Sequence, residues 1–406
     1  MPRLLLLLPA AGYANQDFIG AAARLDIELV ACADYCHRLA PGWGLPPLMS
    51  VQFDQPGVAL PQVLAALSQP VDAVLAADDH GAMLAAKLRE ALGLPGNPPE
   101  AVAALTDKLR FRQLQQASGL PHPAFASVGA DAPAAAVALG FPLVVKARRL
   151  NASRGVIRAD DADQLVQALK QVQRIQARAQ RDKDALLVER FISGVEVALD
   201  GVLSSGALRV LAVFDKPDPL DGPYFEETLF ITPSRLPAAP QRAFAAAVER
   251  ACAAAGVTEG VVHAEARVNE AGVWLLEIAP RGIGGLCGRV LAATLGMDSA
   301  EIVLRHAVGL PLPGPANDTA AGVMMIPIPA SGIFHGVDGQ DEARAVPDIT
   351  GIEITAPPGQ LVAPPPEGAG YLGFLFSRAA TPQQAEAALR TAHAALGVRI
   401  QPLVKP

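Results

Sequence analysis

Short apolar runs alternate with amphipathic stretches over residues 1–105, a pattern that predicts an α/β unit with a parallel sheet. The apolar runs predict strands at Leu4–Leu8, Ile27–Ala33 and Ala73–Ala76. The stretches with helical periodicity predict helices at Ile19–Leu25, Pro61–Leu67 and Gly81–Leu92. Asp78, Asp79 and His80 follow the third predicted strand, where ligands of such sheets bind. A helix cap with solvent-exposed acids explains these three residues equally well.

A hairpin is predicted later in the chain. Val261–Val268 and Val273–Ile278 alternate apolar and polar residues, and a short Asn/Gly connection joins them. If the second strand begins opposite Asn269, Glu265 lies directly across from Glu277, at about 4.5–5.5 Å. Two carboxylates that close repel each other unless a cation lies between them, and their oxygens suit Mg²⁺. The alternative is that the two acids face water. The strands of this hairpin are too apolar for a free surface strand, which disfavours it.

A lysine and a small-residue loop form a second candidate site. Lys146 ends the predicted strand Phe141–Lys146, and the loop Arg148–Gly155 follows with Ser153 and Gly155. A lysine at the end of a buried strand is costly unless it meets an anion. Free backbone N–H groups in such a loop can close over phosphates. A lysine that simply reaches solvent is the alternative.

Two further segments carry polar groups at useful places. Leu186–Asp200 predicts a strand, a turn and a second strand, with Glu189 and Glu196 on either side of the turn. Such a segment can offer backbone groups to a purine and a carboxylate to ribose hydroxyls. Pro280–Gly285 combines the Arg281 guanidinium with a glycine-rich backbone, which suits anionic oxygens.

Composition narrows the function classes. The chain has 406 residues, is 51% hydrophobic and carries a formal net charge of −7, which predicts two or three domains. Its acidity and scattered arginines argue against nucleic-acid binding, and no apolar run reaches the roughly 20 residues that span a bilayer. Few cysteines and no Cys-x-x-Cys pair disfavour structural zinc and predict a cytoplasmic location with free thiols; the cysteines are Cys32, Cys36, Cys252 and Cys287.

Two breaks rich in proline and glycine, Gly93–Pro99 and Leu310–Pro315, divide the chain. Between them, Thr106 is predicted to cap a helix over Asp107–Ser118. The predicted domains are an N-terminal α/β domain, a central domain and a small C-terminal α+β domain, at residues 1–105, 106–315 and 316–406.

In this order and spacing the motifs resemble the ATP-grasp superfamily over most of the chain. The resemblance implies an ATP-grasp fold, with an open parallel α/β domain, a split nucleotide-binding domain and a small C-terminal domain. It also implies roles for particular residues. The expected ATP contacts are Lys108, Lys146, Ser153, Gly155, the adenine hinge Glu189, Arg190 and Phe191, and the ribose-binding Glu196. The expected Mg²⁺ or Mn²⁺ ligands are Glu265 and Glu277. The expected groups around the acyl phosphate are Arg281, Gly284 and Gly285, with Lys108 and Lys146 as further catalytic cations.

Within the superfamily, Gly222–Thr228 resembles a loop of the L-amino-acid ligases, which join amino acids into dipeptides. The resemblance places Glu227 in the substrate pocket, with Phe230 where the family has a histidine. His263 shares a face with Glu265, so it is either a substrate contact or a satisfied core histidine. Two further departures are Ala279, where the family often has a metal-binding asparagine, and a phosphate loop with Asn151 and Ala152 where glycines are common.

The resemblance implies an ATP-dependent carboxylate–amine ligase that forms an amide or peptide bond through an acyl phosphate and releases ADP and phosphate. Its expected partners are a small carboxylate, taken here as an amino acid, and an amine, without nucleic acid or membrane; a homodimer is left open. One alternative is a biotin-carboxylase-like enzyme that phosphorylates bicarbonate. The other is a non-catalytic ATP-binding protein.

Overall fold

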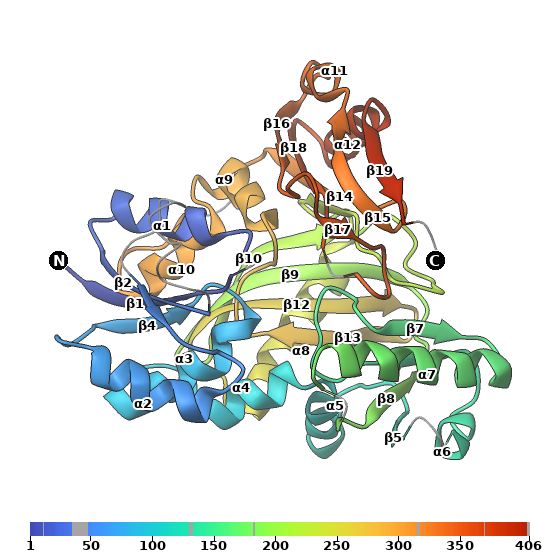
Figure 1. Cartoon of the computed structure of the whole chain (residues 1–406), viewed down its shortest axis with the longest axis horizontal. Helices are drawn as coiled ribbons and strands as arrows, with labels where there is room; N and C mark the ends of the chain where they lie inside the picture. The colour runs from blue at the N-terminus through green and yellow to red at the C-terminus, as the bar shows by residue number, and fades with distance from the viewer. Residues whose placement is uncertain are drawn as a thin grey trace.

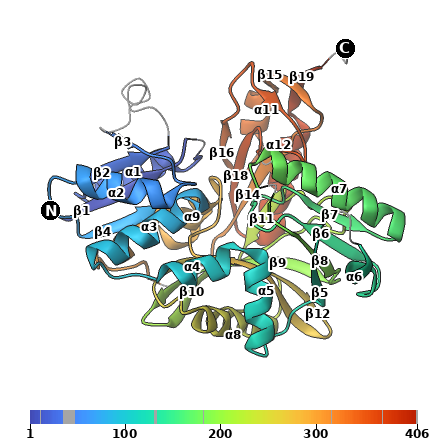
Figure 2. The same cartoon turned by 60° about the horizontal axis from the view of Figure 1, so that its bottom comes forward.

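The computed structural model describes residues 1–10, 12–34, 48–129, 133–181, 183–314, 317–368 and 370–403. Three lobes surround a long central sheet: an N-terminal lobe (blue), a small lobe (green) and a C-terminal lobe (orange to red) (Figures 1 and 2). Cys36 and Pro315, which the sequence analysis singled out, lie outside the described residues. Cys32, Cys252 and Cys287 are free buried thiols, as predicted. None of the helices in the described ranges is long and apolar enough to cross a membrane.

The N-terminal lobe contains the predicted parallel sheet, in the order β3-β2-β1-β4. Its strands are β1 (Arg3–Leu8), β2 (Glu28–Ala33), β3 (Leu48–Ser50) and β4 (Ala73–Ala76), and its helices are α1 (Asn15–Arg24), α2 (Pro56–Ala66) and α3 (Asp79–Leu92). The apolar run of β1 is continuous because both faces are covered: Leu4, Leu6 and Leu8 join one core cluster, and Leu5 and Leu7 join another.

The small lobe is a four-stranded antiparallel sheet, in the order β5-β8-β6-β7, with α7 packed on it. Its strands are β5 (Phe125–Val128), β6 (Leu143–Lys146), β7 (Val156–Ala159) and β8 (Leu186–Arg190). Its helices are α6 (Ala134–Val137) and α7 (Ala162–Arg178), and α4 (Pro99–Thr106) and α5 (Lys108–Ala117) lead into it.

The central sheet has eight strands in the order β13-β12-β9-β10-β11-β14-β18-β16. They are β9 (Val195–Ser204), β10 (Ala207–Asp215), β11 (Leu229–Thr232), β12 (Gly260–Asn269), β13 (Gly272–Ala279), β14 (Ala320–Ile326), β16 (Ile349–Ile354) and β18 (Gly373–Ala379). Helix α8 (Ala238–Ala255) packs on one face, and α9 (Val290–Leu295) packs on the other. The boundary predicted near residue 315 therefore divides one continuous sheet.

The C-terminal lobe adds a three-stranded sheet beside the last strands of the central one. Its strands are β15 (Gly332–Asp338), β17 (Leu361–Val362) and β19 (Gly397–Pro402), and its helices are α11 (Gln340–Arg344) and α12 (Pro382–Ala394). Helix α10 (Ser299–Ala307) instead packs against α1 of the N-terminal lobe. It links that lobe to the central sheet.

Two local predictions are corrected, and one strand was not predicted. Asp107, not Thr106, caps α5, because its carboxylate accepts the N–H groups of Leu109 and Arg110. The second helix begins five residues before Pro61, with Pro56 in its first turn, where proline is tolerated. The sequence analysis also missed the short strand β3.

The hairpin register differs from the predicted one at the loop but not at the two glutamates. Asn269 pairs with Gly272, one residue away from the predicted alignment. A bulge between Glu265 and Ala266 then restores the register, so Glu265 lies opposite Glu277 as predicted.

Candidate active site

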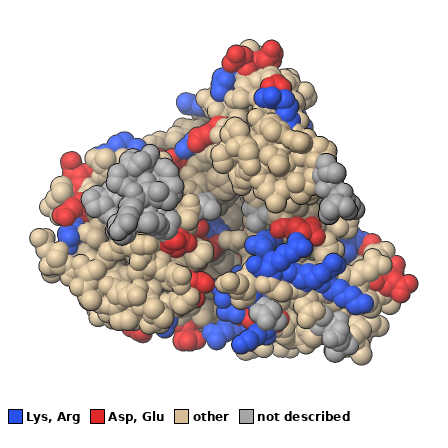
Figure 3. All heavy atoms as spheres, viewed as in Figure 1, with Lys and Arg blue, Asp and Glu red and all other residues tan. Residues whose placement is uncertain are grey.

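A cavity of about 800 Å³ lies where the three lobes meet. Figure 3 shows the molecule hollowed at this junction. Every site residue predicted from the sequence except Gly155 lines the cavity: Lys108, Lys146, Ser153, Glu189, Arg190, Phe191, Glu196, Glu227, His263, Glu265, Glu277, Arg281, Gly284 and Gly285. Segments far apart in sequence thus contribute to one site.

Two lysines in the cavity wall are held in place by neighbouring oxygens. Lys146, the last residue of β6, has its Nζ 2.7 Å from an oxygen of Glu189. Lys108, the first residue of α5, donates to the Leu150 carbonyl at 2.6 Å and lies 3.3 Å from Glu277. Burial lowers the pKa of Lys146, and the charge of Glu189 opposes this shift. Both ammonium groups are therefore positioned before any anion binds.

Arg112 is a buried residue that connects Glu189, the partner of Lys146, to strand β13. Its guanidinium is almost fully buried, donates to Glu189 at 2.7 Å and also bonds the Leu276 carbonyl of β13 at 2.8 Å. Burial would raise the pKa of Glu189, but the charges of Arg112 and Lys146 hold it at about 2. The Glu189 carboxylate is thus paired with two cations. The predicted adenine contact of this residue would therefore be made by its backbone groups.

The loop between β6 and β7 adopts a conformation that glycine favours. Ala152 and Ser153 have φ angles of 51° and 54°, and Gly155 has a φ of 69°. A left-handed conformation costs a residue with a side chain about 1–2 kcal/mol, so the two non-glycine residues strain the loop. Backbone bonds anchor its two ends, from Lys108 N–H to the Arg148 carbonyl and from Gly155 N–H to the Pro366 carbonyl.

The predicted hinge follows β8. Two guanidinium groups lie over the Phe191 ring, with Arg158 Cζ 4.4 Å and Arg267 Cζ 4.9 Å from its centroid. The side chain of Arg190 is exposed. Glu196, near the start of β9, is buried and bonds Arg267 at 3.2 Å.

Glu265 and Glu277 face each other across β12 and β13. Their side chains keep 12% and 32% of their surface exposed, so both carboxylates reach the cavity. Two such carboxylates supply the hard oxygen donors that Mg²⁺ prefers, and the residues present fit a divalent cation. Ala279, which lies opposite His263, adds no ligand atom.

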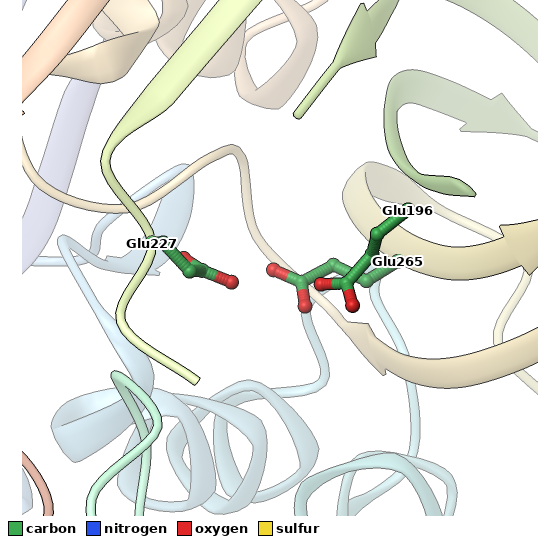
Figure 4. A group of neighbouring side chains, drawn as sticks. All are labelled: Glu196, Glu227 and Glu265. Atoms are coloured by element: carbon green, nitrogen blue, oxygen red, sulfur yellow. The ribbon is translucent and has the colours of Figure 1, made fainter. Parts of the chain in front are cut away.

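A second group of carboxylates shares Glu265. Glu196, Glu227 and Glu265 point toward one another (Figure 4), and their nearest ligand atoms all lie within 4.8 Å of one another. Lys216, just after β10, places its Nζ among them, at 2.7 Å from Glu196, 2.5 Å from Glu227 and 3.3 Å from Glu265. Burial and the charge of Glu265 raise the pKa of Glu227 to about 8, although Lys216 opposes this shift. We call Lys216 and these three glutamates the lysine cage.

Arg281 lines the cavity beside Asp79 of the N-terminal lobe. Its guanidinium bonds Asp79 of the N-terminal lobe at 2.5 Å and the Gly282 carbonyl at 2.7 Å. Burial would raise the pKa of Asp79, but the charge of Arg281 lowers it. Asp78 caps α3 through the His80 N–H. The Asp78–His80 segment thus has both predicted roles. Asp78 caps a helix, and Asp79 contacts a residue of the cavity.

His263 is a buried residue with satisfied nitrogens. Its Nδ1 lies 2.7 Å from Asp200 and its Nε2 lies 3.4 Å from Glu265. Burial would lower its pKa, but bonding to Asp200 and Glu265 raises it to about 9. Asp200 also accepts the Ile283 N–H, so His263 connects a carboxylate of the hairpin to the loop that carries Arg281. These contacts favour the core-histidine interpretation.

Sequence reasoning missed Lys216 and the organising role of Arg112. The signal for Lys216 was present: it follows an apolar strand, as Lys146 does, and a lysine at such a place needs an anion. Arg112 gave no comparable signal, because its partners come from β8 and β13, far along the chain.

The chain is similar to several known proteins in sequence. Residues 139–290 match the ATP-grasp domain, and residues 324–401 match the L-amino acid ligase C-terminal domain 2. The chain is 31% identical over 229 residues to a D-alanine–D-alanine ligase of Pseudomonas entomophila, covering 53% of this chain and 69% of that ligase. It is 35% identical over 276 residues to carnosine synthase 1 of Gallus gallus, covering 63% of this chain but only 30% of that protein.

Among solved structures, the L-amino acid ligase from Bacillus licheniformis superposes with a TM-score of 0.82 at 24% identity, covering 99% of both chains. A biotin carboxylase from Campylobacter jejuni superposes with a TM-score of 0.71 at 16% identity, covering 98% of this chain and 92% of that one. These two likenesses concern the fold, and the predicted ATP-grasp fold is confirmed. The sequence matches show that the chain belongs to the ATP-grasp superfamily of ATP-dependent carboxylate–amine ligases.

Proposed function

We propose that the protein joins the carboxylate of an amino acid to an amine, forming an amide or peptide bond while ATP is converted to ADP and phosphate. The observation that carries this proposal is the single cavity in which two lysines, the Glu265–Glu277 pair and Arg281 converge. The match to an L-amino acid ligase C-terminal domain supports amino acids as substrates and favours the ligase over the biotin-carboxylase alternative.

In the first step, a carboxylate oxygen of the substrate attacks the γ-phosphorus of ATP, and ADP leaves. The chain contributes position and charge rather than covalent chemistry. Lys108 and Lys146 neutralise phosphate oxygens, and their own partners keep them aimed into the cavity. A divalent ion bound by Glu265 and Glu277 would add positive charge at the transferring phosphoryl group.

In the second step, the amine attacks the acyl carbon and phosphate leaves. Arg281 would neutralise the oxyanion, with the backbone of Gly284 and Gly285 beside it. Asp79 already holds one edge of the guanidinium, which limits its motion before substrate binds. Glu227 would face the amino-acid substrate while its carboxyl group contacts the Lys216 ammonium.

Water must be kept from the acyl phosphate, which it would hydrolyse. The loop 148–155 would close over the phosphates. Two observations support this role: Ser153 of the loop lines the cavity, and the Gly155 N–H bonds the Pro366 carbonyl of the C-terminal lobe. The cytoplasmic location, the homodimer and the use of Mn²⁺ remain predictions.

The experiment is product analysis. Purified protein is incubated with ATP, Mg²⁺ and a panel of amino acids, and the products are identified by mass spectrometry. An amide or dipeptide formed together with ADP supports the proposal. Bicarbonate-dependent ATP hydrolysis with carboxylation of biotin would replace it with the carboxylase, and ATP binding without turnover for any carboxylate would favour the non-catalytic protein.

A further inference from the structure

A short segment of the C-terminal lobe contacts the small lobe. It comprises residues 363–368, between β17 and β18, and we call it the strap. The Pro366 carbonyl accepts the Gly155 N–H at 3.1 Å. The Glu367 carboxylate accepts a hydrogen bond from the Gln171 side-chain amide at 2.8 Å. Two consecutive strap residues therefore bond the end of the loop between β6 and β7 and the middle of α7.

The sequence of the strap restricts it to one shape. Its three consecutive prolines, Pro364–Pro366, have rings that fix the backbone φ angle. The Gly368 N–H bonds the Pro364 carbonyl at 3.1 Å and closes a turn. A Cβ added at Gly368 would clash with the Ala363 carbonyl, so the turn requires glycine there. Because the strap is already ordered by these features, it can bond the small lobe at little further cost in chain entropy.

The two contacts of the strap lie on adjoining parts of the small lobe. A Cβ added at Gly155 would lie 3.6 Å from Val172 and 3.5 Å from Ile175, so the end of the loop packs on α7. Gln171 precedes Val172 and is half-buried. Pro366 is buried although it lies in a loop. The bond to Gln171 therefore holds the part of α7 on which the loop ends.

The conformation of the loop 148–155 makes such support necessary. Ala152 and Ser153 are left-handed, a conformation that residues with a side chain disfavour and that surrounding contacts must maintain. Ser153 also lines the cavity, so release of this strain would move a residue of the proposed ATP site. Contacts that fix the end of the loop oppose that release.

We propose that the strap is a latch that holds the loop 148–155 closed and thereby keeps water from the acyl phosphate. Gln171 and Glu367 are its positioning residues, because neither side chain lines the cavity. This inference rests on the proposed function. It goes beyond that proposal by assigning loop closure to one pair of side chains, on two lobes and outside the cavity.

The test reverses the donor and the acceptor of the pair. Gln171→Glu places two carboxylates opposite each other, and their repulsion should release the loop. Adding Glu367→Gln to this variant restores one donor and one acceptor in the opposite sense, so the swapped pair should hold the loop again. Gln173→Glu adds the same charge at an exposed position of α7 and should behave like the wild type.

Loop opening is measured without turnover, by limited trypsin digestion in the presence of a non-hydrolysable ATP analogue. The loop contains Arg148, Arg149 and Arg154, and cleavage there follows the fraction of open loop. Mass spectrometry identifies the cleaved bonds. Cleavage should be about two- to tenfold faster in Gln171→Glu than in the wild type, the range that one hydrogen bond supports, and the swapped pair should restore the wild-type rate.

The second readout is the amount of phosphate released per amide bond formed, which should rise in Gln171→Glu and return to the wild-type value in the swapped pair. Wild-type cleavage rates in Gln171→Glu would overturn the inference. A swapped pair that is cleaved as fast as Gln171→Glu would overturn it as well. A wild-type protein that forms no amide would instead contradict the proposed function, and the cleavage rates would still decide whether the strap is a latch.

Discussion

The Glu265–Glu277 pair and the lysine cage share one glutamate but differ in what balances their charge. In the pair, Glu277 is 32% exposed, and its nearest cation, Lys108, is 3.3 Å away. In the cage, a nearly buried ammonium lies 2.5 to 3.3 Å from three carboxylates. The same side-chain type is therefore open to the cavity in one place, where we propose that a metal ion binds, and forms a closed internal ion cluster in the other. The two places differ in whether a buried ammonium, that of Lys216, lies among the carboxylates.

The largest expected effect comes from the open pair. Glu277→Gln removes one charge and one metal ligand, and ATP turnover should fall by at least about 100-fold. Steady-state ADP release checks this, with Glu270→Gln at the exposed hairpin loop as the control that should retain activity.

The matched change in the cage is Glu227→Gln. It should reduce turnover less, because Lys216 still has Glu196 and Glu265 as partners. It should act mainly on the KM for the amino acid, because Glu227 is proposed to face that substrate. Equal losses in the two glutamine variants would erase the distinction between pair and cage.

The two sites also differ in how far the sequence alone could predict them. The pair lies on one hairpin, where alternation and a short loop fixed the cross-strand neighbours even though the loop register was off by one residue. The cage joins Glu196 on β9, Lys216 after β10 and Glu227 in a later loop, and no local pattern brings them together. Likewise, β1 was evident from its apolar run, whereas the N-cap of α5 required knowing which side chain reaches the backbone.

The next largest effect concerns Arg281, which bonds Asp79 in the same cavity. Arg281→Ala should lower kcat by about 100-fold while changing the KM for ATP little, because its donors match an oxyanion that develops during acyl transfer. Kinetics with ATP and amino acid varied separately measure the split. A rise in the KM for ATP as large as the fall in kcat would place Arg281 at the nucleotide instead.

Lys146→Ala should weaken ATP binding by roughly 1.5–3 kcal/mol, the scale of one charge-assisted hydrogen bond. Glu189 retains Arg112 as a partner, so the variant should stay folded. Titration calorimetry gives the affinity, and Lys170→Ala on the exposed face of α7 is the control. Unchanged ATP affinity would remove Lys146 from the phosphate site.

The last prediction concerns stability rather than activity, through a pH dependence due to His263. Its pKa in the folded protein, about 9, is above the ordinary value of 6.5. Its protonated form therefore stabilises the fold fully below about pH 6.5, and this contribution is lost as the pH rises through 9, by at most about 1.4 kcal/mol per pH unit.

Urea unfolding of the wild type and His263→Gln, without metal or nucleotide, should give stabilities that converge across this window. The exposed His335→Gln serves as the control and should leave the pH profile unchanged. A constant gap between the wild type and His263→Gln would show that His263 does not titrate there.

Acyl phosphate formation is the central claim, and isotope transfer tests it most directly. An amino acid labelled with ¹⁸O in its carboxylate is incubated with ATP, the amine and the protein, and the released phosphate is examined by mass spectrometry. Formation of an acyl phosphate predicts that one labelled oxygen moves from the carboxylate to phosphate for each amide bond formed. Unlabelled phosphate, or cleavage of ATP to AMP and pyrophosphate, would contradict it.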